Sequence, residues 1–182
     1  ENLGARIEDI RILQGDSAAV AHSTGSYASR STVLAGGAAI AASRKLQEKL
    51  LRAASFILEA SVADLKAEDG SIVVVGTDRS ISFRDLAKAV YSEMGRLPRE
   101  VREPLEATEV YDPYFGTTSS ATHICTVDID PRTYRIRVDR YAVCEDCGRV
   151  INPLIVDGQV QGGVAQGIGA ALSEEVVFDE RG

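Results

Sequence analysis

The sequence has 182 residues, of which 45% are hydrophobic, and this is enough for one globular unit or two small ones with a substantial core. Its formal net charge of -7 would repel a phosphodiester backbone, and no basic run offsets that charge, so nucleic acid is excluded as the main partner. The apolar runs are shorter than the roughly 18 residues that span a bilayer, and we therefore predict no membrane segment.

The first third of the sequence predicts a short strand followed by a long helix. Residues 5–13 alternate loosely between apolar and polar side chains and lead into a turn at Gln14-Gly15-Asp16. From Val33 to Glu59, apolar residues recur at helical spacing, which predicts a helix about 40 Å long. We expect this helix to be the main element of the fold.

A polar stretch, Ser29-Arg30-Ser31-Thr32, stands where the long helix is predicted to begin. The N-terminus of a helix has unpaired N–H groups and the positive end of the helix dipole, so hydroxyl groups and an arginine beside it are suited to binding phosphate. The stretch therefore predicts an anion site. The alternative is that Ser31 or Thr32 only caps the helix, as such residues do at many helices without a ligand.

The middle of the sequence predicts a hairpin, a short helix and a long connection. Residues 63–67 and 72–75 flank a Glu68-Asp69-Gly70-Ser71 turn, and Ser82 to Asp85 has the spacing of a capping box before a helix that reaches Met94. The next stretch is rich in proline and irregular. We predict two structural parts of the chain, residues 1–95 and 121–182, joined by a loop over residues 96–120.

The last third predicts a second hairpin, a glycine-rich helix and a final strand. Residues 123–130 and 134–140 alternate on either side of a turn, and residues 157–172 have helical spacing despite five glycines, which suggests close packing against a ligand or another backbone. Residues 175–178 read as a strand and Asp179 to Gly182 as a turn. Overall we predict an α+β fold in which antiparallel strands pack with two main helices.

The three cysteines do not point to a disulfide framework, because their number is odd and the N-terminus lacks the basic and apolar regions of a signal peptide. We predict a cytoplasmic chain with reduced thiols. Cys144 and Cys147 form a C-x-x-C pair, which could suggest zinc or redox chemistry, but Cys125, His22 and His123 do not stand at zinc-ligand spacing and the pair lies in a predicted loop. A Rossmann fingerprint and a nucleophile elbow are also missing.

Two motifs together resemble the large subunit of the xanthine dehydrogenase and aerobic carbon monoxide dehydrogenase family, the molybdenum hydroxylases. They are Gly25-Ser26-Tyr27-Ala28-Ser29-Arg30-Ser31-Thr32, and Asp146-Cys147-Gly148-Arg149-Val150-Ile151-Asn152-Pro153 followed by the glycine-rich stretch to Gly169. The similarity extends over nearly the whole chain. One departure is Tyr134, which stands where the family usually has a turn glycine.

This resemblance implies a molybdenum-molybdopterin cofactor, in its cytosine dinucleotide form, and an enzyme that hydroxylates a carbon centre such as an aldehyde or N-heterocycle, or oxidises carbon monoxide, with water as the oxygen source. It also implies partner subunits or domains that carry FAD and iron-sulfur clusters, and a small-molecule substrate. The cofactor-binding residues that it implies are Tyr27, Ala28, Ser29, Arg30, Ser31, Thr32, Asp146, Cys147, Arg149, Ile151 and Asn152.

The family's catalytic glutamate belongs to a Gly-x-Gly-Glu motif that is not present in this sequence. We therefore predict no catalytic residue and no metal ligand within the 182 residues, and we expect them to be a portion of a longer large subunit that is inactive alone. The alternative is a non-catalytic scaffold or assembly module that keeps the fold without the cofactor.

Overall fold

The computed structural model describes residues 2–20, 25–93, 95, 97–113 and 118–182. The chain divides into two compact units, Glu1–Phe115 and Gly116–Gly182, which we call unit 1 and unit 2 and describe separately. Antiparallel sheets and helices occur together, so the predicted α+β class is confirmed. Of the predicted connection over residues 96–120, Arg96 and residues 114–117 lie outside the described residues, as does Met94 of the predicted short helix.

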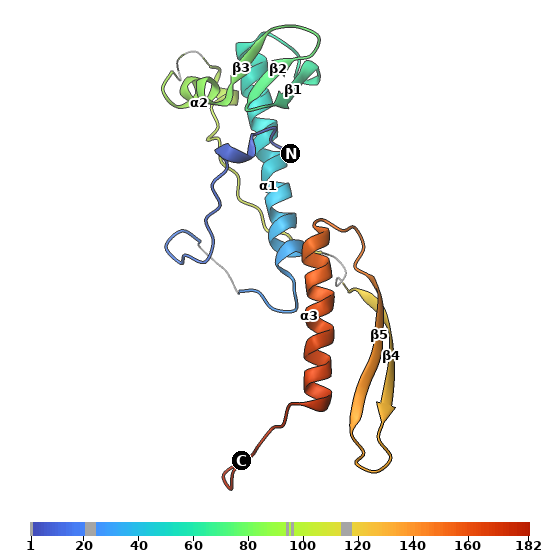
Figure 1. Ribbon diagram of the computed structural model, residues 1–182. Coiled ribbons are helices and arrows are strands. Elements are labelled where there is room, and N and C mark those ends of the chain that lie inside the picture. The colour runs from blue at the N-terminus through green and yellow to red at the C-terminus, as the bar shows by residue number, and fades with distance from the viewer. Residues whose placement is uncertain (1, 21–24, 94, 96, 114–117) are drawn as a thin grey trace. The chain divides into compact units, whose positions relative to one another are not determined.

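Unit 1 contains a long helix, a small sheet and a short helix (Figure 1). The sheet has the strand order β1-β2-β3 and is antiparallel throughout. The predicted long helix, first hairpin and short helix are confirmed within a few residues. The elements are η1 Ile7–Asp9, α1 Ser31–Ile57, η2 Val62–Asp64, β1 Leu65–Glu68, β2 Ser71–Val74, β3 Ser80–Ser82, α2 Phe83–Tyr91 and η4 Arg99–Val101.

The core of unit 1 lies where the C-terminal half of α1 meets the sheet and α2. Ile72 of β2 and Leu86 of α2 are fully buried, and Leu50 of α1 is 5% exposed. The buried residues of α1 are Leu50, Ala53 and Ala54, so its N-terminal half continues beyond the core. The start of α2 is fixed by its predicted cap, since the Ser82 hydroxyl accepts a hydrogen bond from the Asp85 N–H at 3.0 Å.

Residues 103–111, which we call the return segment, run along α1 in the opposite direction (Figure 1). Near the core, Glu103 forms an ion pair with Arg52 at 3.3 Å, and the Lys49 ammonium donates to the carbonyl of Pro104 at 3.1 Å. Further along, the ring of Tyr111 lies against Gly37. Part of the predicted irregular connection is therefore held in place on the long helix.

Unit 2 begins with a long antiparallel hairpin of β4, Ser120–Ile129, and β5, Ile136–Asp146, which confirms the second predicted hairpin. Thr126 pairs with Arg140 but the next residue, Val127, pairs with Val138, so Asp139 is one residue too many and forms a bulge. Because side chains alternate along a strand, this extra residue brings Tyr141 and Val138 to the same face of the hairpin. Without the bulge, Asp139 would take the place of Val138 on this face of the hairpin. The bulge therefore keeps the face apolar on both sides of Asp139.

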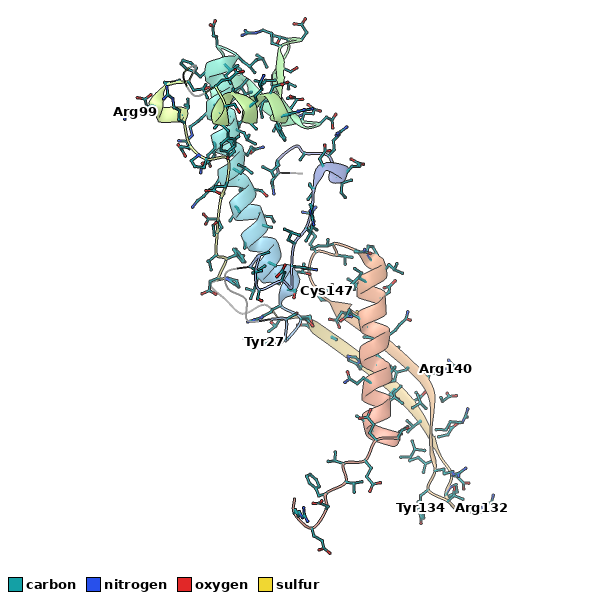
Figure 2. All side chains as sticks on the ribbon, turned by 90° about the vertical axis from the view of Figure 1, so that its left-hand side faces the viewer. Tyr27, Arg99, Arg132, Tyr134, Arg140 and Cys147 are labelled. Atoms are coloured by element: carbon teal, nitrogen blue, oxygen red, sulfur yellow. The ribbon has the colours of Figure 1, made fainter. Side chains whose placement is uncertain are left out.

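The turn of this hairpin contains Tyr134 at a φ of +56°, and the Tyr134 N–H donates to the Asp130 carbonyl at 2.7 Å. The Asp130 carboxylate accepts a hydrogen bond from the Arg132 N–H at 2.8 Å, and this bond with those from Thr133 holds the Asp130 pKa below its usual value. Tyr134 is 79% exposed and lies beside Arg132 at the tip (Figure 2). A bulky residue thus adopts a left-handed backbone conformation that glycine tolerates far better.

Replacing Tyr134 with glycine is expected to stabilise the turn, because glycine adopts a positive φ without steric cost. The gain should be about 1 kcal/mol, reduced by the greater freedom of glycine in the unfolded chain. Amide hydrogen exchange of β4 and β5 should accordingly slow by up to roughly fivefold. Tyr134→Ala is the control, since alanine keeps the Cβ atom; an equal slowing in that variant would show that backbone strain is not the cause.

Helix α3, Pro153–Leu172, follows the hairpin and confirms the predicted glycine-rich helix. The Asn152 side chain accepts a hydrogen bond from the Leu154 N–H at 3.1 Å and so caps its start. No residue of α3 is buried, and the half-buried ones, Val156, Val160, Val164, Ile168 and Gly169, lie mostly four residues apart. Within the described ranges, no helix combines the length and the hydropathy that crossing a membrane requires.

Two predicted strands are wrong. Residues 5–13 contain only the short 3-10 helix η1, and residues 175–178 have no regular structure, although the final turn is present as a Gly182 N–H to Asp179 carbonyl bond of 3.1 Å. Their apolar side chains are exposed, with Ile7 at 81% and Val177 at 80%. An alternation of apolar and polar side chains only favours an extended backbone. A strand forms when a neighbouring strand supplies hydrogen bonds to that backbone.

Candidate functional site

The polar stretch before α1 leaves the start of the helix without a side-chain cap. The helix begins at Ser31, its N-cap residue is Arg30, and no side chain accepts a capping hydrogen bond there. The Ser31 hydroxyl instead donates to the Ser26 hydroxyl at 2.6 Å. The alternative interpretation, in which Ser31 or Thr32 caps the helix, is therefore wrong. The first hydrogen bond of the helix runs from the Leu34 N–H to the Arg30 carbonyl. The N–H groups of the residues before Leu34 therefore have no partner within the helix and point out of its N-terminal end.

The guanidinium group of Arg30 is held in a defined orientation beside this helix start. It lies 3.6 Å from the centroid of the Tyr27 ring, and its Nη2 and Nε atoms donate to the Gly25 carbonyl at 2.7 and 3.2 Å. The ring and the carbonyl are neutral groups, and these contacts orient the guanidinium. The first turn of α1 contains no acidic residue, so the positive end of the helix dipole is not offset within that turn.

The backbone between Tyr27 and Arg30 is strained. Ala28 and Ser29 have φ values of 51° and 55°, a left-handed conformation that costs about 1–2 kcal/mol for a residue other than glycine. Arg30 returns to the right-handed region, with φ -77° and ψ -11°. Such strain occurs preferentially at binding sites, where it directs backbone N–H groups. Tyr27 itself is 61% exposed and lies just before the helix start (Figure 2).

The second predicted segment, residues 146–152, connects β5 to α3 in unit 2. The Asp146 carboxylate accepts a hydrogen bond from the Gly148 N–H at 2.9 Å, and Gly148 has a φ of +74° that glycine adopts without strain. Asn152 is the helix cap described above. Between these two fixed ends, Cys147 (labelled in Figure 2) and Arg149 are exposed. Ile151 is 77% exposed. Asp146 and Asn152 therefore shape the loop, and the side chains between them remain accessible.

The two segments belong to different units, and each is a candidate anion site by itself. Both precede the N-terminus of a long helix whose first turn has no acidic residue, and each contains one arginine, Arg30 or Arg149. In unit 1 the structure brings together Gly25, Tyr27 and Arg30. In unit 2 it connects Asp146 with Gly148. These features fit phosphate groups better than metal ions.

Metal and disulfide chemistry find no support in the described part of the chain. It contains no group of three or more His, Cys, Asp and Glu side chains that could hold a metal ion. Cys125, Cys144 and Cys147 are free and exposed. His22, one of the zinc ligands weighed above, lies outside the described residues.

Two features of the site were not predicted from the sequence. The Gly25 carbonyl holds Arg30, and the ring of Tyr111 covers Gly37 two turns into α1. The sequence did contain one signal for the second contact, since Gly36 and Gly37 are adjacent glycines in a helix that otherwise has none. Nothing in the sequence indicated that the partner would be Tyr111.

Comparison with known proteins identifies matches over the whole chain. Residues 1–182 match the family model described as molybdopterin cofactor-binding domain. The nicotine 6-hydroxylase large subunit of Paenarthrobacter nicotinovorans is 38% identical over 181 residues, which are 99% of this chain and 22% of that protein. The carbon monoxide dehydrogenase large chain of Hydrogenophaga pseudoflava is 34% identical, over 99% of this chain and 22% of its own length.

A solved structure has a similar fold. Quinoline 2-oxidoreductase from Pseudomonas putida 86 matches with a TM-score of 0.73 and 38% identity, over 86% of this chain and 20% of that one. The chain thus spans about a fifth of the length of the proteins it matches. The resemblance to molybdenum hydroxylase large subunits is confirmed.

Proposed function

Because the chain belongs to the molybdopterin cofactor-binding domain family, we propose that it forms part of the cofactor-binding region in the large subunit of a molybdenum hydroxylase. The parent protein would be an oxidoreductase, like the large subunits that the chain resembles. The observation that carries the proposal is the uncapped start of α1 with the oriented charge of Arg30 beside it. This arrangement suits a phosphate-bearing cofactor.

The proposed contacts divide by unit. In unit 1 the phosphates would accept hydrogen bonds from the N–H groups of the first turn, and Arg30 would supply a charged fork of donors. In unit 2 the loop held by Asp146 and Asn152 would approach the cofactor with its exposed residues. The full set is Tyr27, Ala28, Ser29, Arg30, Ser31, Thr32, Asp146, Cys147, Arg149, Ile151 and Asn152.

When bound, the molybdenum pyranopterin would supply the oxidation of the substrate, with water as the oxygen source. We propose its cytosine dinucleotide form, and partner subunits or domains with FAD and iron-sulfur clusters that accept the electrons. Relatives named for nicotine and carbon monoxide favour an N-heterocycle or carbon monoxide as the substrate class, and an aldehyde stays a prediction. A cytoplasmic location, and inactivity of the 182 residues alone, stay predictions.

The deciding measurement is the molybdenum content per chain of the complete parent protein, together with the nucleotide that acid releases from it. We expect molybdenum and a cytidine nucleotide in about equal amounts. A well-folded parent protein with neither would support the alternative, a scaffold or assembly module that keeps the fold without the cofactor. Molybdenum without a nucleotide would reject only the dinucleotide form.

A further inference from the structure

The N-terminal half of α1 receives its support from outside the core. All buried residues of this helix lie at or beyond Leu50, whereas the candidate phosphate site lies before Val33. Gly36 and Gly37 stand between the two, and glycine is a poor helix former. The first turns of α1 therefore need other contacts to keep a fixed position.

The return segment supplies such contacts in a regular order along the helix. Lys49 donates to the Glu106 carbonyl at 2.9 Å, and closer to the helix start Lys45 forms an ion pair with Glu109. Next comes Tyr111, so the segment follows α1 from the core toward the candidate site (Figure 1). Its other end is tied to α2, because the Tyr91 hydroxyl accepts a hydrogen bond from the Leu105 N–H at 2.7 Å.

The contact between Tyr111 and Gly37 is possible only because Gly37 has no side chain. A Cβ atom built there would lie no more than 2.6 Å from three carbons of the Tyr111 ring, a separation that real Cβ atoms do not show. The neighbouring Gly36 is different, since a Cβ at that position meets nothing within 4 Å. The Tyr111 ring thus packs directly against Gly37, in the space that a side chain at that position would fill.

We propose that Tyr111 is a positioning residue for the candidate phosphate site: its ring, seated on Gly37, holds the first turns of α1 and with them Arg30 and the N–H groups of the helix start. This inference rests on the proposed function, which assigns the phosphate groups to that helix start. Tyr111 acts through the helix and does not need to touch the cofactor. The packing of the aromatic ring on Gly37 holds the helix, and the phenol hydroxyl is not required for it.

The test compares four variants of the complete parent protein: Gly37→Ala, Gly36→Ala, Tyr111→Ala and Tyr111→Phe. The two glycine variants make the same change at neighbouring positions of one helix, and only the first adds an atom that displaces the ring. Two quantities are measured, the nucleotide released by acid per chain and the hydrogen exchange of the amides of residues 31–38.

We expect Gly37→Ala and Tyr111→Ala to lower the nucleotide content at least threefold and to speed exchange of residues 31–38 about tenfold. Tyr111→Phe should match the unmodified protein in both measurements. Gly36→Ala should slow the exchange, because alanine favours a helix, and should retain the nucleotide. Tyr111→Ala removes atoms without adding any, so it decides the question even if Gly37→Ala does not fold.

Two failures can be told apart. Full nucleotide content and unchanged exchange in Tyr111→Ala would overturn the positioning role and leave the proposed function intact. A parent protein that holds neither molybdenum nor a nucleotide in unmodified form would reject the proposed function. In that case the exchange of residues 31–38 alone decides whether Tyr111 holds the helix start, and unchanged exchange in Tyr111→Ala would overturn that as well.

Discussion

Replacing Arg30 with alanine in the complete subunit is expected to weaken cofactor binding by roughly 10- to 100-fold, because a charged hydrogen bond contributes about 1.5–3 kcal/mol. The loss should appear as lower molybdenum and nucleotide contents after dialysis. Arg30→Lys should be intermediate, since lysine keeps the charge but lacks the planar fork that suits phosphate. Lysine would also lose the paired bonds to the Gly25 carbonyl.

The matched control is Arg44→Ala. Arg44 is an exposed arginine on the same helix, more than three turns beyond the candidate site. Its removal should leave both contents unchanged. If Arg30→Ala and Arg44→Ala had equal effects, the loss would reflect overall charge, and the assignment of Arg30 to a phosphate would be wrong. A scaffold without cofactor would show no molybdenum in any of these proteins.

Replacing Leu86 with alanine is expected to destabilise unit 1 by about 3 kcal/mol, because the side chain is fully buried and its removal leaves a cavity. Leu86 belongs to the core cluster that includes Ile72 and Leu50, so α1, α2 and the sheet should all be affected. Hydrogen exchange of the β1 and β2 amides should become roughly 150-fold faster.

Leu13→Ala provides the comparison for Leu86. It makes the same substitution in the same unit, at a position that is 60% exposed. Its effect should stay within about 0.5 kcal/mol. Similar destabilisation by both variants would mean that the core does not lie between α2 and the sheet.

Elements with strong local signals were predicted well from the sequence. The long helix shows apolar residues at helical spacing, and α2 combines such spacing with the Ser82 cap, which the structure retains. The hairpins have turn residues between alternating runs. The two strands predicted at residues 5–13 and 175–178 failed because strand formation depends on a partner, and a local pattern does not contain that information.

The candidate site shows the same division. Arg30 and Ser31 could be recognised because they stand at a predicted helix start, and the motif around Asp146 and Asn152 could be recognised through its resemblance to a family. The orientation of Arg30 on the Tyr27 ring, however, depends on a left-handed turn at residues that rarely adopt one. The contact of Tyr111 with Gly37 joins residues far apart in the chain, and no local signal pairs them.

The distribution of buried residues has a consequence for biosynthesis. Every buried residue in the described part of the chain lies in unit 1, at or before Leu97. The core contacts are available once residues up to Leu97 have left the ribosome, and the contact of Tyr111 with Gly37 once the return segment has followed. The helix start that carries Arg30 can therefore be in place before β4 emerges. We therefore expect unit 1 to fold during synthesis, before the hairpin and the helix of unit 2 emerge from the ribosome.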